Sequence, residues 1–291
     1  MKEKSVRLSI ILCIISISAA FLSGCFPLPY SYTQYTPKYM SWNTFRSAET
    51  TGIAEKRPLV NPGKIYVFGD LLFVNERNEG IHVFDNRDIA NPVPIAFIEV
   101  LGSLDISVLS INGKTYLYTD SFVDLLVFEI NPDPTAFSAT LVKRLEDTFP
   151  YNPQQAFMDS GEPVWFYYEE VDKNQGVVVG YEKQERTEWQ LVGIGPFEQE
   201  VLMDSTAGNA ASGIGGSMAR FSLYGHPVSG SDTAEWYLYI VNETDLAVLN
   251  LQNPSNPARQ ATINLGWGIE TIYEYNRSEE RRVGKECTLR C

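Results

Sequence analysis

The residue of this sequence that is best placed to do chemistry is Cys25, whose thiol follows a short apolar run. Three basic residues begin the chain, an apolar run broken only by serines covers 8–22, and Ser23 and Gly24 are small. This is the layout of a secretory signal that is processed near its end. A membrane-spanning helix needs roughly 20 apolar residues. The run is shorter, and Pro27 then ends any helix, because proline lacks the amide donor.

The four residues Leu22-Ser23-Gly24-Cys25 resemble the lipobox of bacterial lipoproteins. In that family the cysteine thiol is diacylated, the signal is cut before it and the new amino terminus is acylated. The resemblance implies a signal peptide over 1–24 and lipidation of Cys25, and several acyl chains on one residue give stable anchoring. Phe26 stands where an aspartate often retains such proteins at the inner membrane. This favours an outer-membrane destination in a cell with two membranes.

The C-terminal tail, residues 277–291, reverses the composition of the apolar stretch before it. The string over 277–287 closely resembles the translation of a widely used short-read sequencing adapter. We therefore interpret 277–291 as a non-native tail and leave it out of the reasoning on the fold. The natural protein is then expected to continue beyond Asn276.

The cysteines follow from these two assignments. Cys13 lies in the signal, and Cys287 and Cys291 lie in the tail, so Cys25 is the single cysteine of the predicted mature protein. Neither a disulfide framework nor a thiolate metal site is therefore possible in the body of the chain.

The composition is that of an acidic globular protein. The chain has 291 residues, 44% of them hydrophobic and 12% aromatic, which is enough for one sizeable core and argues against disorder. Without the signal and the tail, 15 basic and 32 acidic residues remain, a net charge of −17. A surface this acidic repels phosphate backbones and anionic headgroups, so we expect no nucleic-acid partner.

The chain has two histidines. His82 lies between Ile81 and Val83 in an alternating strand, so its side chain is predicted to point away from theirs, toward solvent or a neighbouring repeat. His226 lies in Tyr224-Gly225-His226-Pro227, a predicted loop or turn. Neither belongs to a His-x-x-x-His pair or a His–carboxylate pair of metal-ligand spacing, so the sequence does not support a transition-metal site.

Paired carboxylates are the chemistry of glycoside hydrolysis. Asp120 and Asp124 flank a strand start, and Glu169, Glu170 and Asp172 cluster in a predicted hairpin turn. Their spacing is not that of a calcium loop, and the chain has no Gly-x-Ser-x-Gly elbow for a nucleophilic serine. We interpret these carboxylates as solvated loop residues, and predict no catalytic residue, no cofactor and no metal. Four tryptophans could line a carbohydrate surface, but are interpreted as core or inter-repeat packing: Trp165, Trp189, Trp236 and Trp267.

The elements that would position any site are repeated pairs of β-rich runs. In each pair the second run begins nine residues after the first and polar residues join the two, which is typical of a β-hairpin. The pairs are 72–75 with 81–84, 116–119 with 125–128, and 237–240 with 246–249.

Each pair is followed by an Asn-Pro turn and a third apolar run. The turns include Asn91-Pro92 and Asn256-Pro257, in which proline presets φ and asparagine bonds the turn. The third runs are 95–100, 139–145 and 260–265, and the first two units are 44 residues apart. Units of this length are typical of propeller blades, whose neighbours supply the core, whereas a sandwich does not repeat as one unit. We predict an all-β fold, a partial β-propeller with about three to four blades of an incomplete ring, over 58–276.

Two stretches resemble the LVIVD repeat: Gly80–Asp85 with Asn91-Pro92, and Leu246–Leu251 with Pro254-Ser255-Asn256-Pro257. This repeat is found in predicted β-propeller lipoproteins, notably of Bacteroidetes-type bacteria. The first unit departs from it, with Phe84-Asp85-Asn86 where the family tends to Val-Asp-Ile or Val-Asp-Leu. The resemblance implies an extracytoplasmic repeat protein and no known activity. Three more stretches resemble blocks of the family: Asn61–Val67, Gly215–Phe221 and Gly266–Ile272.

The remaining segments lie outside this repeat. Residues 25–57 are predicted to be a Tyr-rich and Pro-rich tether, with a short helix somewhere in Ser41–Glu55. The runs 164–168 and 176–181 are predicted to form a hairpin. The Gly-rich stretch 193–216 is interpreted as a flexible loop, because it lacks the lysine of a phosphate-binding loop.

Two functions follow from these predictions. The first is a cell-envelope lipoprotein, anchored through Cys25, whose propeller binds or scaffolds an envelope protein or a glycan on the periplasmic or the outer surface. The alternative is an exported propeller enzyme, such as a carbohydrate-active one, whose site lies partly in C-terminal blades beyond Asn276. The sequence favours the first, and with it a role that is not enzymatic.

Overall fold

The computed structural model describes residues 27–47, 50–151, 153, 166–191, 220–228, 234–242, 244–266, 269 and 271–272. They form an all-β structure, as predicted, with one short helix, α2 (Trp42–Phe45). The chain divides into two compact units. The described part of the first unit is 27–38 with 166–171 and 180–191, and the second unit contains the remaining residues.

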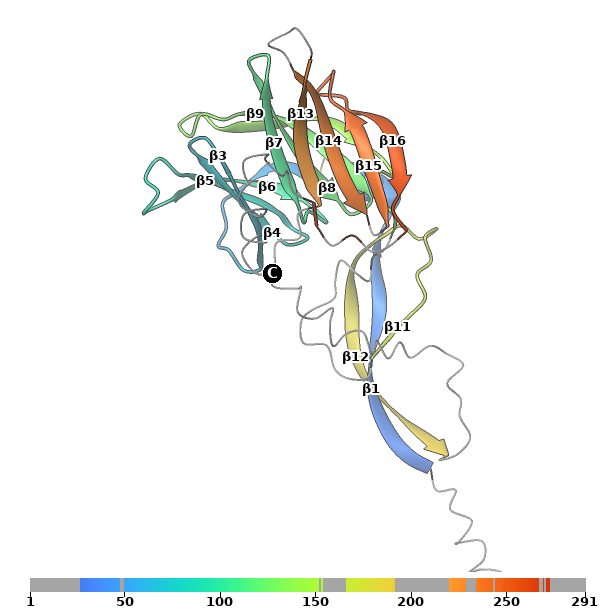
Figure 1. Ribbon diagram of the computed structural model, residues 1–291. Coiled ribbons are helices and arrows are strands. Elements are labelled where there is room, and N and C mark those ends of the chain that lie inside the picture. Colours follow the sequence, from blue (N-terminus) through green and yellow to red (C-terminus); the bar gives the residue numbers. More distant parts are fainter. Residues whose placement is uncertain are drawn as a thin grey trace, which may run out of the picture. The chain divides into compact units, whose positions relative to one another are not determined.

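Three antiparallel sheets make up most of the second unit, and each contains a meander of four strands in sequence order (Figure 1). The first sheet consists of β3 (Pro62–Phe68), β4 (Leu71–Glu76), β5 (Gly80–Asp85) and β6 (Val93–Val100), with β2 (Thr51–Ala54) beside β6. The middle sheet consists of β7 (Ile106–Ile111), β8 (Lys114–Ser121), β9 (Asp124–Asn131) and β10 (Ser138–Leu145). The third sheet consists of β13 (Phe221–Pro227), β14 (Ala234–Asn242), β15 (Asp245–Asn250) and β16 (Ala258–Asn264).

The three predicted hairpins are confirmed as β4–β5, β8–β9 and β14–β15, and the third apolar runs are β6, β10 and β16. Several opposite residues on the central strands are apolar on both strands, as in the pairs Leu117↔Phe128 and Leu238↔Leu249. Gly80 starts β5 at φ 150°, where a Cβ atom would meet the Ile98 carbonyl of β6. Only glycine allows this close approach of two backbones.

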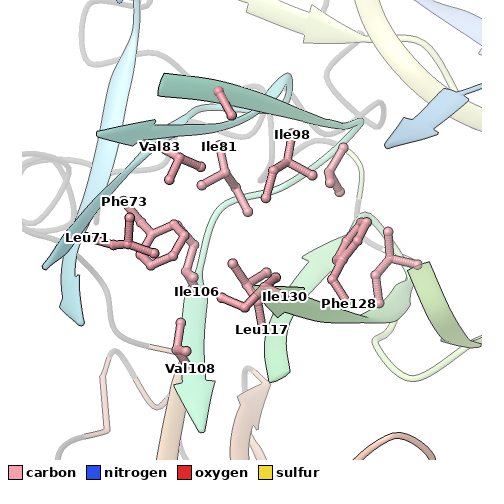
Figure 2. Packing of buried hydrophobic residues seen from close by; sticks show 13 residues of the cluster. Leu71, Phe73, Ile81, Val83, Ile98, Ile106, Val108, Leu117, Phe128 and Ile130 are labelled. Atoms are coloured by element: carbon pink, nitrogen blue, oxygen red, sulfur yellow. The ribbon is translucent and has the colours of Figure 1, made fainter. Parts of the chain in front are cut away.

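A first core lies between the first and middle sheets. Because side chains alternate across a strand, one face of each sheet is apolar and packs against the other. Figure 2 shows Phe73 and Val83 of the first sheet on one side of this core, with Val108, Leu117 and Phe128 of the middle sheet on the other. All five side chains are buried.

A second core lies between the middle and third sheets. Tyr118 and Val127 of the middle sheet point away from the first core and pack with Leu238, Ile240 and Leu249 of the third sheet. The middle sheet therefore has both faces buried. Burial of each large apolar side chain contributes roughly 1.5–3 kcal/mol, so this sheet carries the largest share of the hydrophobic stabilisation.

The segment between β1 and β3 contains α2 and β2. The Ser41 side chain caps α2 by accepting a hydrogen bond from the Thr44 N–H, which confirms the short helix predicted here. Phe45 is buried with Val123 and Val177 in a third apolar cluster. Much of the range assigned to a tether thus belongs to the second compact unit.

A separate sheet of three strands shows where the sequence analysis was wrong. It contains β11 (Phe166–Tyr168), β1 (Pro27–Met40) and β12 (Val177–Leu191), in that order. The two runs predicted to form a hairpin, β11 and β12, are not neighbours, because β1 lies between them. β1 pairs with β11 in parallel, with Tyr35 opposite Tyr168. Their rings stack at 4.5 Å, and such aromatic pairs stabilise a small sheet.

Candidate functional site

The predicted lipidation site, Cys25, lies outside the described residues, and so do the signal over 1–24 and the tail over 277–291. The described chain starts at Pro27, with β1. Among the described residues, no helix has both the length and the apolar character needed to cross a bilayer. Lipidation of Cys25 therefore stays a prediction from the sequence.

Asp105 is a buried carboxylate of the second unit that no motif in the sequence marks. It precedes β7, is fully buried, and forms an ion pair with Lys64 of β3. It also accepts hydrogen bonds from the backbone N–H groups of Ile106 at 2.6 Å and Phe221 at 2.9 Å. One side chain thus ties together β3, β7 and β13, the first strand of each meander.

Asp120 at the end of β8 forms a second buried hub beside it. Its carboxylate accepts hydrogen bonds from the N–H groups of Leu104 and Asp105 at 2.8 and 2.9 Å, and from Arg220 Nη1 at 2.9 Å. Burial raises the pKa of both Asp105 and Asp120, while Lys64 and Arg220 act against that rise. Neither carboxylate has exposed surface through which a substrate could reach it.

Asp124 at the start of β9 is the third buried carboxylate. Arg46, just after α2, donates to both of its oxygens, at 3.0 and 2.8 Å, and Arg144 of β10 donates at 3.1 Å. The interpretation of Asp120 and Asp124 as solvated loop residues is therefore wrong. Their cation partners are distant in the sequence, and buried charges persist only when they are paired.

His82 and Glu76 form a buried pair on the face of the first sheet that points away from the middle sheet. His82 points away from Ile81 and Val83, as predicted, but it does not face solvent or another sheet. Its Nε2 lies 3.1 Å from Glu76 Oε2, and both side chains are 2% exposed. The prediction of a solvent-facing or inter-repeat position for His82 is wrong, because a segment of the chain covers this face.

That covering segment is 57–61. The N–H groups of Val60 and Asn61 donate to the Glu76 carboxylate, and the Arg57 guanidinium lies 3.8 Å from the Phe97 ring centre. Burial tends to raise the pKa of Glu76, but the two N–H donors and His82 outweigh it and hold the pKa below its usual value. The Glu76 carboxylate therefore fastens this segment to the sheet as an anion.

His226 lies in strand β13 and not in the predicted loop. Its Nε2 is 2.9 Å from the Tyr239 hydroxyl, and its ring stands edge-on to Tyr224 and Tyr237. Gly225 and Pro227 are residues typical of turns, but here the stretch is extended. Pro227 is the last residue of β13, an edge strand, where a missing N–H is tolerated.

The remaining candidates are dispersed. Glu170 and Asp172 are exposed and Glu169 is half-buried, so the solvated interpretation holds for the first two. Trp189 is 71% exposed, whereas Trp236 packs against the second core. Trp165 and Trp267 lie outside the described residues, as does the Gly-rich stretch 193–216.

The buried charged groups described above hold parts of the fold together. The three buried aspartates and Glu76 are each held by N–H donors, by cations or by both. In the part of the chain that the structure describes, no three His, Cys, Asp or Glu side chains are grouped so that they could hold a metal ion. Of the two carboxylates paired in the sequence, Asp120 joins the middle sheet to Arg220 at the start of the third sheet, and Asp124 joins β9 to β10 and to Arg46 after α2.

Comparison of the chain with protein-family models and with curated proteins found no match.

Proposed function

We propose that this chain is a lipoprotein of the bacterial cell envelope that is anchored through Cys25, and that its role is binding or scaffolding and not nucleic-acid recognition or catalysis. The observation that carries the proposal is the run 8–22 followed by Leu22-Ser23-Gly24-Cys25. The charge supports it as well, since a net −17 disfavours anionic partners such as nucleic acid. An outer-membrane destination, periplasmic or surface-facing, is part of the proposal and rests on Phe26.

We further propose that the three meanders are blades of a β-propeller of the LVIVD-repeat kind. Their strand order within each sheet, their packing face to face and the two successive cores support this arrangement. A repeat unit that cannot bury its faces alone gains stability from its neighbours. The loops at one end of such an array would receive an envelope protein or a glycan.

An enzymatic role draws no support from the described residues. Asp120 and Asp124, the best carboxylate pair in the sequence, are buried and engaged by Arg220, Arg46 and Arg144. We therefore keep the binding or scaffolding role as the proposal.

The test is acylation of Cys25 in a bacterial host. The full chain should incorporate labelled palmitate and sediment with membranes, whereas Cys25→Ser should do neither. Cys13→Ser, which changes the other cysteine near the N-terminus, is the matched control and should behave as the unchanged chain. Membrane sedimentation of Cys25→Ser equal to that of the unchanged chain would refute the anchor.

The binding role needs a separate experiment. The Cys25→Ser protein, released from the membrane, should capture a specific envelope protein or glycan from extracts of the same cells. Hydrolysis of glycans or esters by the purified protein, without stable capture, would instead favour the exported enzyme.

A further inference from the structure

The strand nearest the predicted anchor, β1, begins with an uncharged stretch. Cys25 precedes β1 by two residues, and the chain has no acidic or basic residue from Cys25 to Pro37. The predicted mature chain has a net charge of −17, and all of its charged residues follow this stretch. The stretch instead contains tyrosines at positions 30, 32 and 35. Tyr and Trp are the residues typical of membrane–water interfaces, because their rings are apolar and their tips are polar.

The strands β1 and β12 place aromatic side chains at one end of the three-stranded sheet. Ser31 Oγ lies 3.0 Å from Thr187 Oγ1, and the ring centres of Tyr35 and Tyr181 are 6.3 Å apart. The two strands are therefore antiparallel, and the end of β12 lies beside the start of β1, near the bottom of Figure 1. We call this the anchor-proximal end of the sheet. Three of its aromatic residues are Tyr30, Tyr32 and Trp189.

The two tyrosines of this end are held in place by one carboxylate. The rings of Tyr30 and Tyr32 stack, with their centres 5.6 Å apart. Both hydroxyls donate to the Glu188 carboxylate of β12, at 3.3 and 2.9 Å. Side chains that are already ordered lose little conformational entropy when they contact a partner. The pair is therefore prepared for an interaction.

Trp189 lies on the other face of the same sheet end. Glu188 shares a face with the two tyrosines that it bonds, and successive residues of a strand point to opposite faces. The Trp189 side chain is 71% exposed. A glycan or a peptide that stacks on aromatic rings meets them on one face of a sheet. A lipid interface, in contrast, can surround the end of the sheet and contact both faces.

The distance from the anchor allows such a contact. An extended chain spans at most about 3.3–3.6 Å per residue. Tyr30 and Tyr32 are five and seven residues from Cys25, so their Cα atoms lie at most about 18 and about 25 Å from that of Cys25. A lipidated Cys25 lies at the membrane surface. The anchor-proximal end therefore stays close to the headgroups.

We propose that the anchor-proximal end is a membrane-contact surface, at which Tyr30, Tyr32 and Trp189 lie among the headgroups of a zwitterionic phospholipid bilayer. The proposal rests on the proposed anchor at Cys25 and adds a second contact, made by protein side chains. Headgroups without net charge fit best, because the stretch after Cys25 is uncharged and Glu188 disfavours anionic lipid. The two contacts together orient this sheet toward the membrane, whereas acyl chains alone leave its orientation free.

The test supplies the anchor chemically, so it does not depend on acylation in a cell. The chain from Cys25 onward, with Cys287→Ser and Cys291→Ser, is coupled through the Cys25 thiol to a maleimide-bearing lipid in phosphatidylcholine vesicles. Bromine atoms on the acyl chains quench tryptophans close to them. The coupled chain should lose fluorescence in brominated vesicles, and more with bromines near the headgroups than with bromines at the chain ends. Trp189→Phe should remove most of this loss.

Two further measurements sharpen the result. Trp236→Phe is the matched control, because Trp236 packs against the second core, and it should leave the loss of fluorescence unchanged. Vesicles rich in phosphatidylglycerol should quench Trp189 less than phosphatidylcholine vesicles do, because Glu188 and the acidic chain are repelled by anionic headgroups.

Three outcomes would overturn the proposal. One is equal quenching of the coupled chain with and without Trp189→Phe. Another is stronger quenching of Trp189 in vesicles rich in phosphatidylglycerol. The third is a response of Trp189 to soluble glycan fragments and none to brominated lipid, which would assign the aromatic side chains to a sugar. The coupled chain carries its anchor whether or not a cell acylates Cys25, so this test and the palmitate test fail independently.

Discussion

The β8–β9 face of the middle sheet and the β14–β15 face of the third sheet carry the same side chains in different surroundings. Tyr118 is fully buried and bonds the backbone of another sheet, whereas its counterpart Tyr239 is half-buried and bonds His226 of its own sheet. The local sequence and the register are alike in both. Burial on these faces therefore depends on the neighbouring sheet and not on the strand itself.

The outer face of the first sheet is a third case. Here the chain covers the face with its own segment 57–61, which Glu76 holds through the Val60 and Asn61 N–H groups. His82 and Phe97 are buried beneath it. The outer face of a sheet can therefore be covered by another sheet or by a short segment. Here the Glu76 carboxylate holds the covering segment in place.

The largest expected difference between the middle and third sheets is at Asp124 and its counterpart Asp245. Asp124→Ala should cost about 4 kcal/mol of unfolding free energy, because Arg46 and Arg144 lose their buried partner. Asp245→Ala should cost less than about 1 kcal/mol, because Asp245 is half-buried and bonds the Asn264 amide. Denaturant unfolding measures both. Similar costs for the two substitutions would contradict the expected difference between the two sheets.

A smaller difference is expected at Leu125 and Leu246, identical residues at matched positions. Leu125→Ala removes a fully buried side chain and should cost about 3 kcal/mol. Leu246→Ala removes a half-buried one and should cost about 1 kcal/mol in this chain. Equilibrium unfolding in urea is the measurement. A loss at Leu246 as large as that at Leu125 would show that its face is already covered.

An effect smaller than those at Asp124 and Leu125 is expected where the chain covers its own first sheet. Glu76→Gln should cost about 2 kcal/mol at neutral pH, because charged hydrogen bonds to Val60 and Asn61 are lost. The pKa of Glu76 lies below its usual value. Its contribution is therefore complete above the unfolded pKa of about 4.3 and is lost as the pH falls through the lower, folded pKa.

Hydrogen exchange of the Val60 and Asn61 amides measures this last effect directly. The protection factor of each amide, which compares its exchange with the intrinsic rate at the same pH, should fall in acid for the unchanged chain and should be low at all pH values for Glu76→Gln. Other titratable or charged residues near Glu76 and this segment include His82, Arg57 with its partner Glu79, and Arg77, whose N–H donates to the Asn61 carbonyl. Acid-insensitive protection of both amides in the unchanged chain would disprove the role given to Glu76.

Much of the strand pattern was predictable, because it rests on local signals. The hairpins β4–β5, β8–β9 and β14–β15 follow from β-rich runs at fixed spacing. The three-stranded sheet was not predictable in this way. β11 and β12 read as one hairpin, and only the long-range insertion of β1 separates them. A Tyr-rich stretch with prolines gives no period that would reveal such a strand.

The buried carboxylates show the same limit at the level of side chains. Asp120 and Asp124 lie between apolar runs, and this position is the signal in the sequence that favours their burial. Arg220 is 100 residues from Asp120 in the chain, and Arg46 is 78 residues from Asp124. No local sequence pattern shows which of these residues pair. An acidic chain also contains more carboxylates than cations, so many pairings are conceivable for each buried charge.

The all-β class and the repeated hairpins follow from the sequence alone, because they depend on periodicity and turn residues. The predicted lipidation of Cys25 also rests on the sequence alone, because it depends on a short contiguous motif. Tertiary structure decided which identical faces are buried and which carboxylates become hubs. Tyr118 and Tyr239 both follow Tyr-Leu and both lie opposite a valine, but another sheet covers only Tyr118. Contacts between sheets join residues that are far apart in the chain, so their energy is set by the assembled fold.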